Sequence, residues 1–312
     1  MKFIEAAIEF ADESGRIKTP ASRRSFLKVM AHLNKVASGA GPGVEIEDMT
    51  DKDLTEWCLL GREDNGQPCA PSTIRNRRAH ARSLFSWATW KGYIDTDPAS
   101  QLKWSVRPGT GGVVRHTWLD EETAETILNE RRDHPAAQRD RIIILIGMMT
   151  GLRAGVEMVG LQWDHFSDDM TSFDVVGKGS KMATVGVPEQ LREALVEWKK
   201  KRPEGAPYVL PRFRKVWSPQ LREEIWMCDW WTSLKYDGVL HAVRQTGLRH
   251  GVKLRPHDLR RSFASILEAQ GVPLNDISLA MRHENVATTS RYLDRNPAKG
   301  AAVTTGFRIG SK

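Results

Sequence analysis

From residue 153 onward, the 312-residue chain carries six side chains that could do chemistry on an anionic group. They stand at the ends of expected helices and strands and are, in order, Arg153, Lys178, His257, Arg260, His283 and Tyr292. Guanidinium groups bind oxyanions through paired hydrogen bonds, and imidazole transfers protons near neutral pH. A tyrosine hydroxyl can act as a nucleophile once its proton is removed.

The spacing of these residues indicates which of them can meet. His257 and Arg260 form an H-x-x-R pair, whose i,i+3 spacing puts both on one helix face. His283 and Tyr292 are nine residues apart, so one continuous helix would point them in opposite directions. The intervening VATTS (286–290) offers N-cap residues for a new helix, and such a break would let them meet. Each piece alone is common, whereas the full ordered set is not.

Composition restricts the class of protein. The net charge of +7 suits a polyanionic partner, although basic proteins of many kinds exist. The three cysteines form no C-x-x-C pair, which argues against a disulfide framework and a cysteine-based zinc site. The acidic, amphipathic opening is unlike a signal peptide. The longest apolar run, Ile142–Met149, is far shorter than the ~20 residues that span a bilayer. A reduced, intracellular, soluble protein is expected.

Residues 1–106 are expected to be mostly helical, because apolar residues recur there at helical spacing. A helix over 72–92 has a basic first half and an apolar second half, in which Phe85, Trp87 and Trp90 are expected in the core. Its basic residues, with no acidic residue among them, are Arg75, Arg77, Arg78 and Arg82. They could form a solvated face or dock on DNA phosphates, and we predict DNA binding.

The Gly- and Pro-rich stretch RPGTGGVVRHT (107–117) predicts a linker to a larger second domain. In that domain two strands are expected over 172–178 and 181–187, joined by a hairpin turn at Gly179–Ser180. Helices are expected over 120–133, 136–151, 188–201 and 257–271. This part of the chain therefore mixes helices with a small β-sheet.

The complete set of motifs resembles the tyrosine recombinase (phage integrase) family. TGLR, GKGSKMATVGVP, HDLRRSFAS and RHENVATTSRY match its catalytic-domain motifs, and residues 72–99 resemble the end of its helical core-binding domain. The resemblance implies a mainly α fold with a small β-sheet. It divides the chain into a SAM-like core-binding domain over 1–106, a linker over 107–117, and a mixed α/β catalytic domain with a C-terminal tail over 118–312.

The resemblance also implies site-specific DNA recombination, in which strands are cleaved and rejoined without ATP, metal or cofactor. Tyr292 would attack the scissile phosphate, leaving a 3′-phosphotyrosyl link and a free 5′-hydroxyl. Arg153 and Arg260 would bind the transition state bidentately, a task that lysine performs less well. His257 would assist removal of the tyrosine proton, and His283 would hydrogen-bond the phosphate.

The remaining proton transfer, to the leaving 5′-oxygen, belongs in this family to a lysine on the hairpin. The family pattern favours Lys178, and Lys181 is its rival.

Two positions near the catalytic motifs depart from the family pattern. One extra residue follows Arg153, so that Val156 stands where an acidic residue is usual and Glu157 comes one later. A helical bulge could absorb the insertion, which leaves support of Arg153 by Glu157 in doubt. Arg282 stands where glycine usually precedes His283, and could contact phosphate or tighten the turn.

The expected partner is double-stranded DNA with inverted-repeat core sites, and a homotetramer is expected to join two such sites. The expected location is the cytoplasm of a bacterial or phage-infected cell, at the nucleoid, and no membrane partner is expected. We expect no extra module before the helical domain, as is typical of recombinases that act at simple core sites. The tail after Tyr292 could dock on a neighbouring protomer or be a frayed end. The alternatives are a type IB topoisomerase, a non-cleaving DNA-binding protein of the same fold, and an RNA-binding helical protein.

Overall fold

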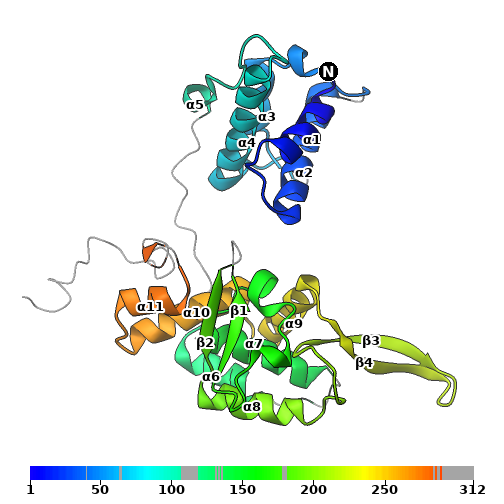
Figure 1. Ribbon diagram of the computed structural model, residues 1–312, viewed down its shortest axis with the longest axis vertical. Helices are drawn as coiled ribbons and strands as arrows, with labels where there is room; N and C mark the ends of the chain where they lie inside the picture. Colours follow the sequence, from blue (N-terminus) through cyan, green and yellow to red (C-terminus); the bar gives the residue numbers. More distant parts are fainter. Residues whose placement is uncertain are drawn as a thin grey trace, which may run out of the picture. The chain divides into compact units, whose positions relative to one another are not determined.

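The chain forms two compact units, Met1–Arg115 and His116–Lys312 (Figure 1). The structure, a computed structural model, describes residues 1–39, 41–62, 65–106, 119–130, 132, 134, 136–177, 181–283, 285, 286 and 289. The predicted linker over 107–117 therefore lies outside the described residues. Within these ranges no helix has both the length and the apolar character needed to cross a membrane.

The first unit is built from helices whose apolar faces share one core. These are α1 (Phe3–Glu13), α2 (Pro20–Ser38), η1 (Ile46–Asp48), α3 (Asp51–Leu59), α4 (Pro71–Trp90) and α5 (Leu102–Ser105). Helix α2 begins at Pro20, because the Thr19 side chain accepts the Ser22 N–H at 3.1 Å and Pro20 suits the first helical position. Phe85 is fully buried and Trp87 is nearly so, as predicted, whereas Trp90 at the end of α4 is 77% exposed and the core prediction is wrong for it.

The second unit is also mainly helical and contains two small antiparallel sheets. Its helices are α6 (Glu121–Asn129), α7 (Ala137–Thr150), η2 (Ala154–Met158), η3 (Trp163–His165), α8 (Glu189–Lys199), α9 (Tyr236–Arg249), α10 (Pro256–Ala269) and α11 (Leu274–Ala280). Helix α7 is buried on nearly all sides, since α8, α9 and α10 all pack against it. The predicted mainly α fold with a small β-sheet is confirmed.

The two sheets differ in how well they could be predicted. The expected strands form β1 (Ser172–Val176) and β2 (Met182–Gly186), paired in register from Ser172 with Gly186 to Val176 with Met182. Their turn at Gly179–Ser180 lies outside the described residues. A second hairpin, β3 (Pro211–Ser218) and β4 (Glu223–Ser233), was not predicted and projects from the core of the unit (Figure 1).

Helices α7 and α10 approach each other closely at glycines of α7. A Cβ added at Gly147 would lie 2.7 Å from Leu259 Cδ1, and one added at Gly151 would lie 2.6 Å from Phe263 Cδ1. Gly151 also has a φ of +59°, the left-handed geometry that ends α7. The residues after α7 are thereby held against the first turns of α10.

Candidate active site

Four of the six predicted catalytic residues lie in the described part of the chain, at the ends of three helices. Arg153 follows α7, His257 and Arg260 occupy the first turns of α10, and His283 follows α11. Arg260 is 1% exposed, and its guanidinium donates to the carbonyls of Gly151 and Met281. That side chain joins the end of α7 to the end of α11, and the structure thus brings the four residues together.

Arg153 is held by a buried carboxylate from the next turn of chain. Its Nη1 donates to Glu157 Oε1, and its backbone N–H donates to Glu157 Oε2 at 2.9 Å. Its Nη2 donates to the carbonyl of Arg282 at 3.0 Å. Element η2, which runs from Ala154 to Met158, is a π-helix. The suspected helical bulge is therefore present, and it brings Glu157 onto Arg153.

Glu157 is 4% exposed and stays ionised. Burial alone would raise the pKa of this carboxyl, because it disfavours the charged form. The Arg153 N–H and the guanidiniums of Arg282 and Arg153 outweigh that effect and hold the pKa of Glu157 below its usual value. A carboxylate that remains charged keeps Arg153 fixed across the neutral pH range.

The two histidines lie within the field of these arginines. His283 is half-buried, its N–H donates to the carbonyl of Ser278 at 3.0 Å, and its Nδ1 lies 2.8 Å from the hydroxyl of fully buried Thr289. Desolvation, followed by the charges of Arg260 and Arg153, lowers the pKa of His283 to about 4. At neutral pH the ring is uncharged, and Thr289 can fix its orientation.

His257 differs from His283 in its exposure to solvent at the start of α10. Desolvation within the site and the nearby Arg261 and Arg260 lower the pKa of His257 to about 4. A neutral imidazole is the form that can accept a proton.

Lys178 and Tyr292 lie outside the described residues, but the base of the lysine hairpin is described. The Gly177 N–H donates to the carbonyl of Lys181 at 2.7 Å. A Cβ added at Gly177 would lie 3.5 Å from Glu157 Oε1. The residue that precedes Lys178 thus lies against the carboxylate that holds Arg153.

The arginines of α4 divide into buried and exposed side chains, so the prediction for them needs one correction. Arg77 is 9% exposed, donates to the carbonyls of Trp57 and Leu60 at 2.9 Å, and lies over the Trp57 ring. It is a core residue, because its spacing on α4 turns it inward.

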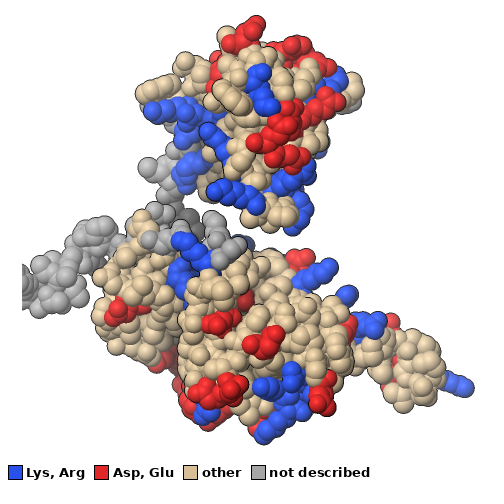
Figure 2. Space-filling model, in the orientation of Figure 1, with Lys and Arg blue, Asp and Glu red and all other residues tan. Residues whose placement is uncertain are grey.

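The other three α4 arginines are more accessible. Half-buried Arg78 donates to the carbonyl of Val106 at 3.0 Å, whereas Arg75 and Arg82 are exposed. In this unit, basic side chains gather on the side of α4 and α5, and acidic ones gather near α1 (Figure 2).

Three residues of the site were not predicted as site residues. The sequence does not predict that Glu157 supports Arg153, because it cannot show whether an insertion forms a bulge. Thr289 was considered only as an N-cap, although its hydroxyl faces His283. Arg282 carries the clearest signal, a bulky cation where the family pattern has glycine.

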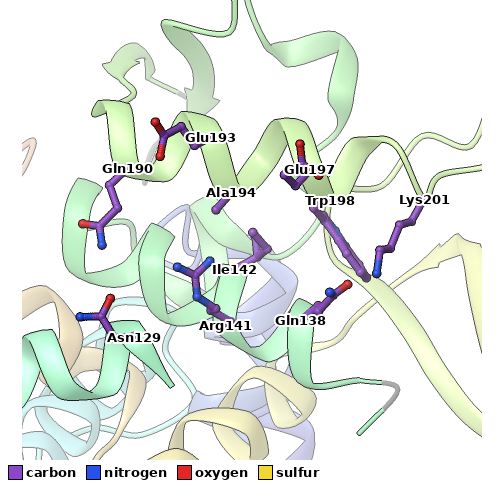
Figure 3. Close-up of a pocket in the computed structure, with 10 residues that line it drawn as sticks. All are labelled: Asn129, Gln138, Arg141, Ile142, Gln190, Glu193, Ala194, Glu197, Trp198 and Lys201. Carbon is purple, nitrogen blue, oxygen red and sulfur yellow. The ribbon is translucent and has the colours of Figure 1, made fainter. Parts of the chain in front are cut away.

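A separate cavity of about 570 Å³ lies between α7 and α8 (Figure 3). Its charged lining includes Arg141, Glu193, Glu197 and Lys201, and none of the four predicted catalytic residues that the structure describes lines it. Within the described ranges, no group of three His, Cys, Asp or Glu side chains could hold a metal ion.

Solved structures show that this arrangement is an integrase fold. A lambda integrase fragment (residues 75–356) in a dimer bound to a core site is similar with a TM-score of 0.67 at 17% identity, covering 94% of this chain and 96% of that one. A Tn1549 transposon integrase fragment in complex with circular intermediate DNA gives a TM-score of 0.65 at 17% identity, with 98% of each chain covered.

Sequence comparison gives the family itself. The Phage integrase family model matches residues 117–299, more than half of the chain. A tyrosine recombinase XerC from Mycobacterium sp. (strain KMS) is 26% identical over 298 residues, covering 92% of each protein. Another XerC, from Xanthomonas axonopodis pv. citri, is 29% identical over 224 residues, covering 70% of this chain and 66% of the relative. The chain belongs to the phage integrase family, and it is a tyrosine site-specific recombinase.

Proposed function

We propose that this recombinase cleaves one DNA strand with Tyr292 while Arg153 and Arg260 hold the scissile phosphate. The Tyr292 oxygen forms a bond to phosphorus, and the bond from phosphorus to the 5′-oxygen breaks. The product is a 3′-phosphotyrosyl link and a free 5′-hydroxyl strand. Attack by a 5′-hydroxyl of another strand reverses the step and rejoins the DNA. The observation that carries this proposal is the meeting of Arg153, Arg260, His257 and His283 at the ends of α7, α10 and α11.

Each side chain suits its proposed role. Guanidiniums fixed beforehand stabilise the negative charge that builds on the nonbridging oxygens. Neutral His257 can take the proton of the tyrosine hydroxyl, whose unperturbed pKa is about 10. Lys178 donates the proton that the leaving 5′-oxygen needs, with Lys181 as the alternative donor. His283, oriented by Thr289, hydrogen-bonds the phosphate.

The proposed partner is double-stranded DNA that carries inverted-repeat core sites. The first unit serves as the core-binding domain, and exposed Arg75 and Arg82 contact phosphates. Four copies join two sites. A lambda integrase tetramer bound to a Holliday junction supports this assembly, since its fold matches with a TM-score of 0.68 at 16% identity, covering 93% of this chain and 76% of that one.

A nicked suicide substrate tests the assignment of Tyr292, because a short product diffuses away and leaves protein trapped on the DNA. We expect a covalent adduct on the 3′ side of the break, formed in EDTA without ATP. Tyr292→Phe removes only the hydroxyl, so DNA binding survives and the adduct disappears.

Tyr236→Phe is the matched control for this experiment. Tyr236 begins α9 next to the site, and its ring lies 3.4 Å from a Cβ added at Gly155. This variant should still form adduct, and peptide mapping should find the DNA on Tyr292. Adduct on another residue contradicts the mechanism. Relaxation of plasmids without site preference would favour a topoisomerase, and binding without any adduct would favour the non-cleaving alternative.

A further inference from the structure

Arg282 has a backbone geometry that normally calls for glycine. Its φ is +54°, and it directly follows the C-cap residue of α11, Met281. The Arg282 N–H donates to the carbonyl of Leu279 at 2.8 Å, and the next N–H, of His283, donates to the carbonyl of Ser278 at 3.0 Å. This pair of bonds is a Schellman motif, whose left-handed position favours glycine because a Cβ is disfavoured there. The arginine side chain should therefore serve a purpose that offsets this preference.

That side chain points into the protein. Its Nη1 donates to the carbonyl of Ala280 at 2.8 Å, and Nη2 lies 3.3 Å from the carbonyl oxygens of both Thr150 and Gly151. Nη2 also donates to Glu157 Oε2 at 3.1 Å, and the side chain is 14% exposed. The guanidinium thus joins α11, the end of α7 and η2.

The two positions that depart from the family pattern are in direct contact, because Arg282 binds Glu157. The extra residue after Arg153 shifts the supporting acid to Glu157, and the residue in the place of glycine is the arginine that binds that acid. Glu157 divides its oxygens between the partners, with Oε1 on Arg153 and Oε2 shared by the Arg153 N–H and Arg282. The Arg282 carbonyl also accepts from Arg153 Nη2. Arg282 therefore acts on Arg153 in two ways, through Glu157 and through its own backbone carbonyl.

We propose that Arg282 is a positioning residue that, through Glu157 and its own carbonyl, aims the Arg153 guanidinium at the scissile phosphate. This inference rests on the proposed function, which assigns Arg153 to that phosphate. Without Arg282, Glu157 would pair with Arg153 alone and neutralise it. With Arg282, the three charges of +1, +1 and −1 leave a net charge of +1 beside the phosphate.

Arg282→Gly tests the proposal, because it supplies the residue that the backbone prefers and removes only the side chain. We expect single-turnover cleavage of the suicide substrate to fall roughly 10- to 100-fold, the cost of a misplaced catalytic group. DNA affinity should change less than about threefold and the folded state should persist, since the binding surface is intact and strain is relieved. Cleavage at the wild-type rate overturns the proposal. If the glycine variant does not fold, Arg282→Asn takes its place, because asparagine tolerates the same backbone.

Arg222→Gly is the matched control. Arg222 has a φ of +53° in the exposed turn between β3 and β4, so the change relieves the same strain away from the site. It should leave cleavage unchanged.

Two further variants separate this proposal from others. If Arg282 acts through Glu157, Glu157→Gln/Arg282→Gly should cleave within about threefold of the slower single variant. Effects that multiply instead would mean independent roles and would overturn it.

Arg153→Lys distinguishes failure of the proposed function from failure of the proposal for Arg282. If Arg153→Lys cleaves normally, the proposed function fails at Arg153; if it abolishes cleavage while Arg282→Gly cleaves normally, only the proposal for Arg282 fails.

Discussion

At the scale of single residues, arginines carry the positive charge of the site, and both histidines are neutral at pH 7. Arg260 lies among backbone carbonyls, Arg153 is fixed by Glu157, and both lie close enough to His283 to lower its pKa. A DNA phosphate entering this site would meet positive charge that is already oriented, which reduces the reorganisation needed during the reaction.

The neutral state of His283 should appear in the pH dependence of stability. Its pKa is about 4 in the folded protein and near 6.5 when unfolded. The unfolded chain therefore binds more protons between these values, and the unfolding free energy should fall as pH falls through that window. Urea denaturation at about pH 7, 6 and 5 measures this slope, to which one such group contributes at most about 1.4 kcal/mol per pH unit.

We expect His283→Asn to reduce that dependence without abolishing it, because the pKa of His257 is also lowered to about 4. His241→Asn, at an exposed position of α9, serves as the control and should retain it. An unchanged slope in His283→Asn would show that the imidazole is already solvated in the folded state.

At the scale of elements, patterns with a clear period could be predicted and local irregularities could not. Helix α10 follows from its apolar periodicity, helix α7 from a long apolar run that ends at Gly151, and the hairpin of β1 and β2 from two short apolar segments around a glycine turn. The hairpin of β3 and β4 could not be predicted in this way, because it projects from the core and both of its faces carry mixed residues. Trp217 and Trp231, for example, are 63% and 59% exposed there. In the same way, no periodicity shows that η2 absorbs an inserted residue as a π-helix.

Helix α4 allows a direct comparison of exposed and buried arginines. Arg82→Ala should weaken DNA binding and reduce the slope of log affinity against log salt by about 1, because one phosphate contact is lost. Arg77→Ala should leave that slope unchanged. It should instead lower the unfolding free energy by roughly 1–3 kcal/mol, since the Trp57 and Leu60 carbonyls lose their donor. Anisotropy titrations at several salt concentrations and urea denaturation measure the two effects. If Arg77→Ala keeps its stability but lowers the slope of log affinity against log salt, Arg77 contacts DNA and is not a core residue.

At the scale of the whole molecule, the two units have separate hydrophobic cores. One core joins α1 to α4, and the other surrounds α7. The residues between them, 107–118, are rich in glycine and lie outside the described part of the chain. Because each unit has its own core, each can remain folded independently of the other.

Limited proteolysis tests this organisation. Arg107 precedes proline, so Arg115 is the site within 107–117 that trypsin can use. In the free protein we expect early cleavage after Arg115, giving fragments 1–115 and 116–312 that resist further digestion because each retains a core. Arg115→Gln is the control and should remove this cleavage without changing DNA affinity. Bound core-site DNA should slow cleavage at Arg115 if both units contact the duplex, whereas unrelated DNA at matched salt should protect less. A free protein that resists trypsin at Arg115 while exposed loops elsewhere are cut would show a single rigid body, and the two-domain organisation would then be wrong.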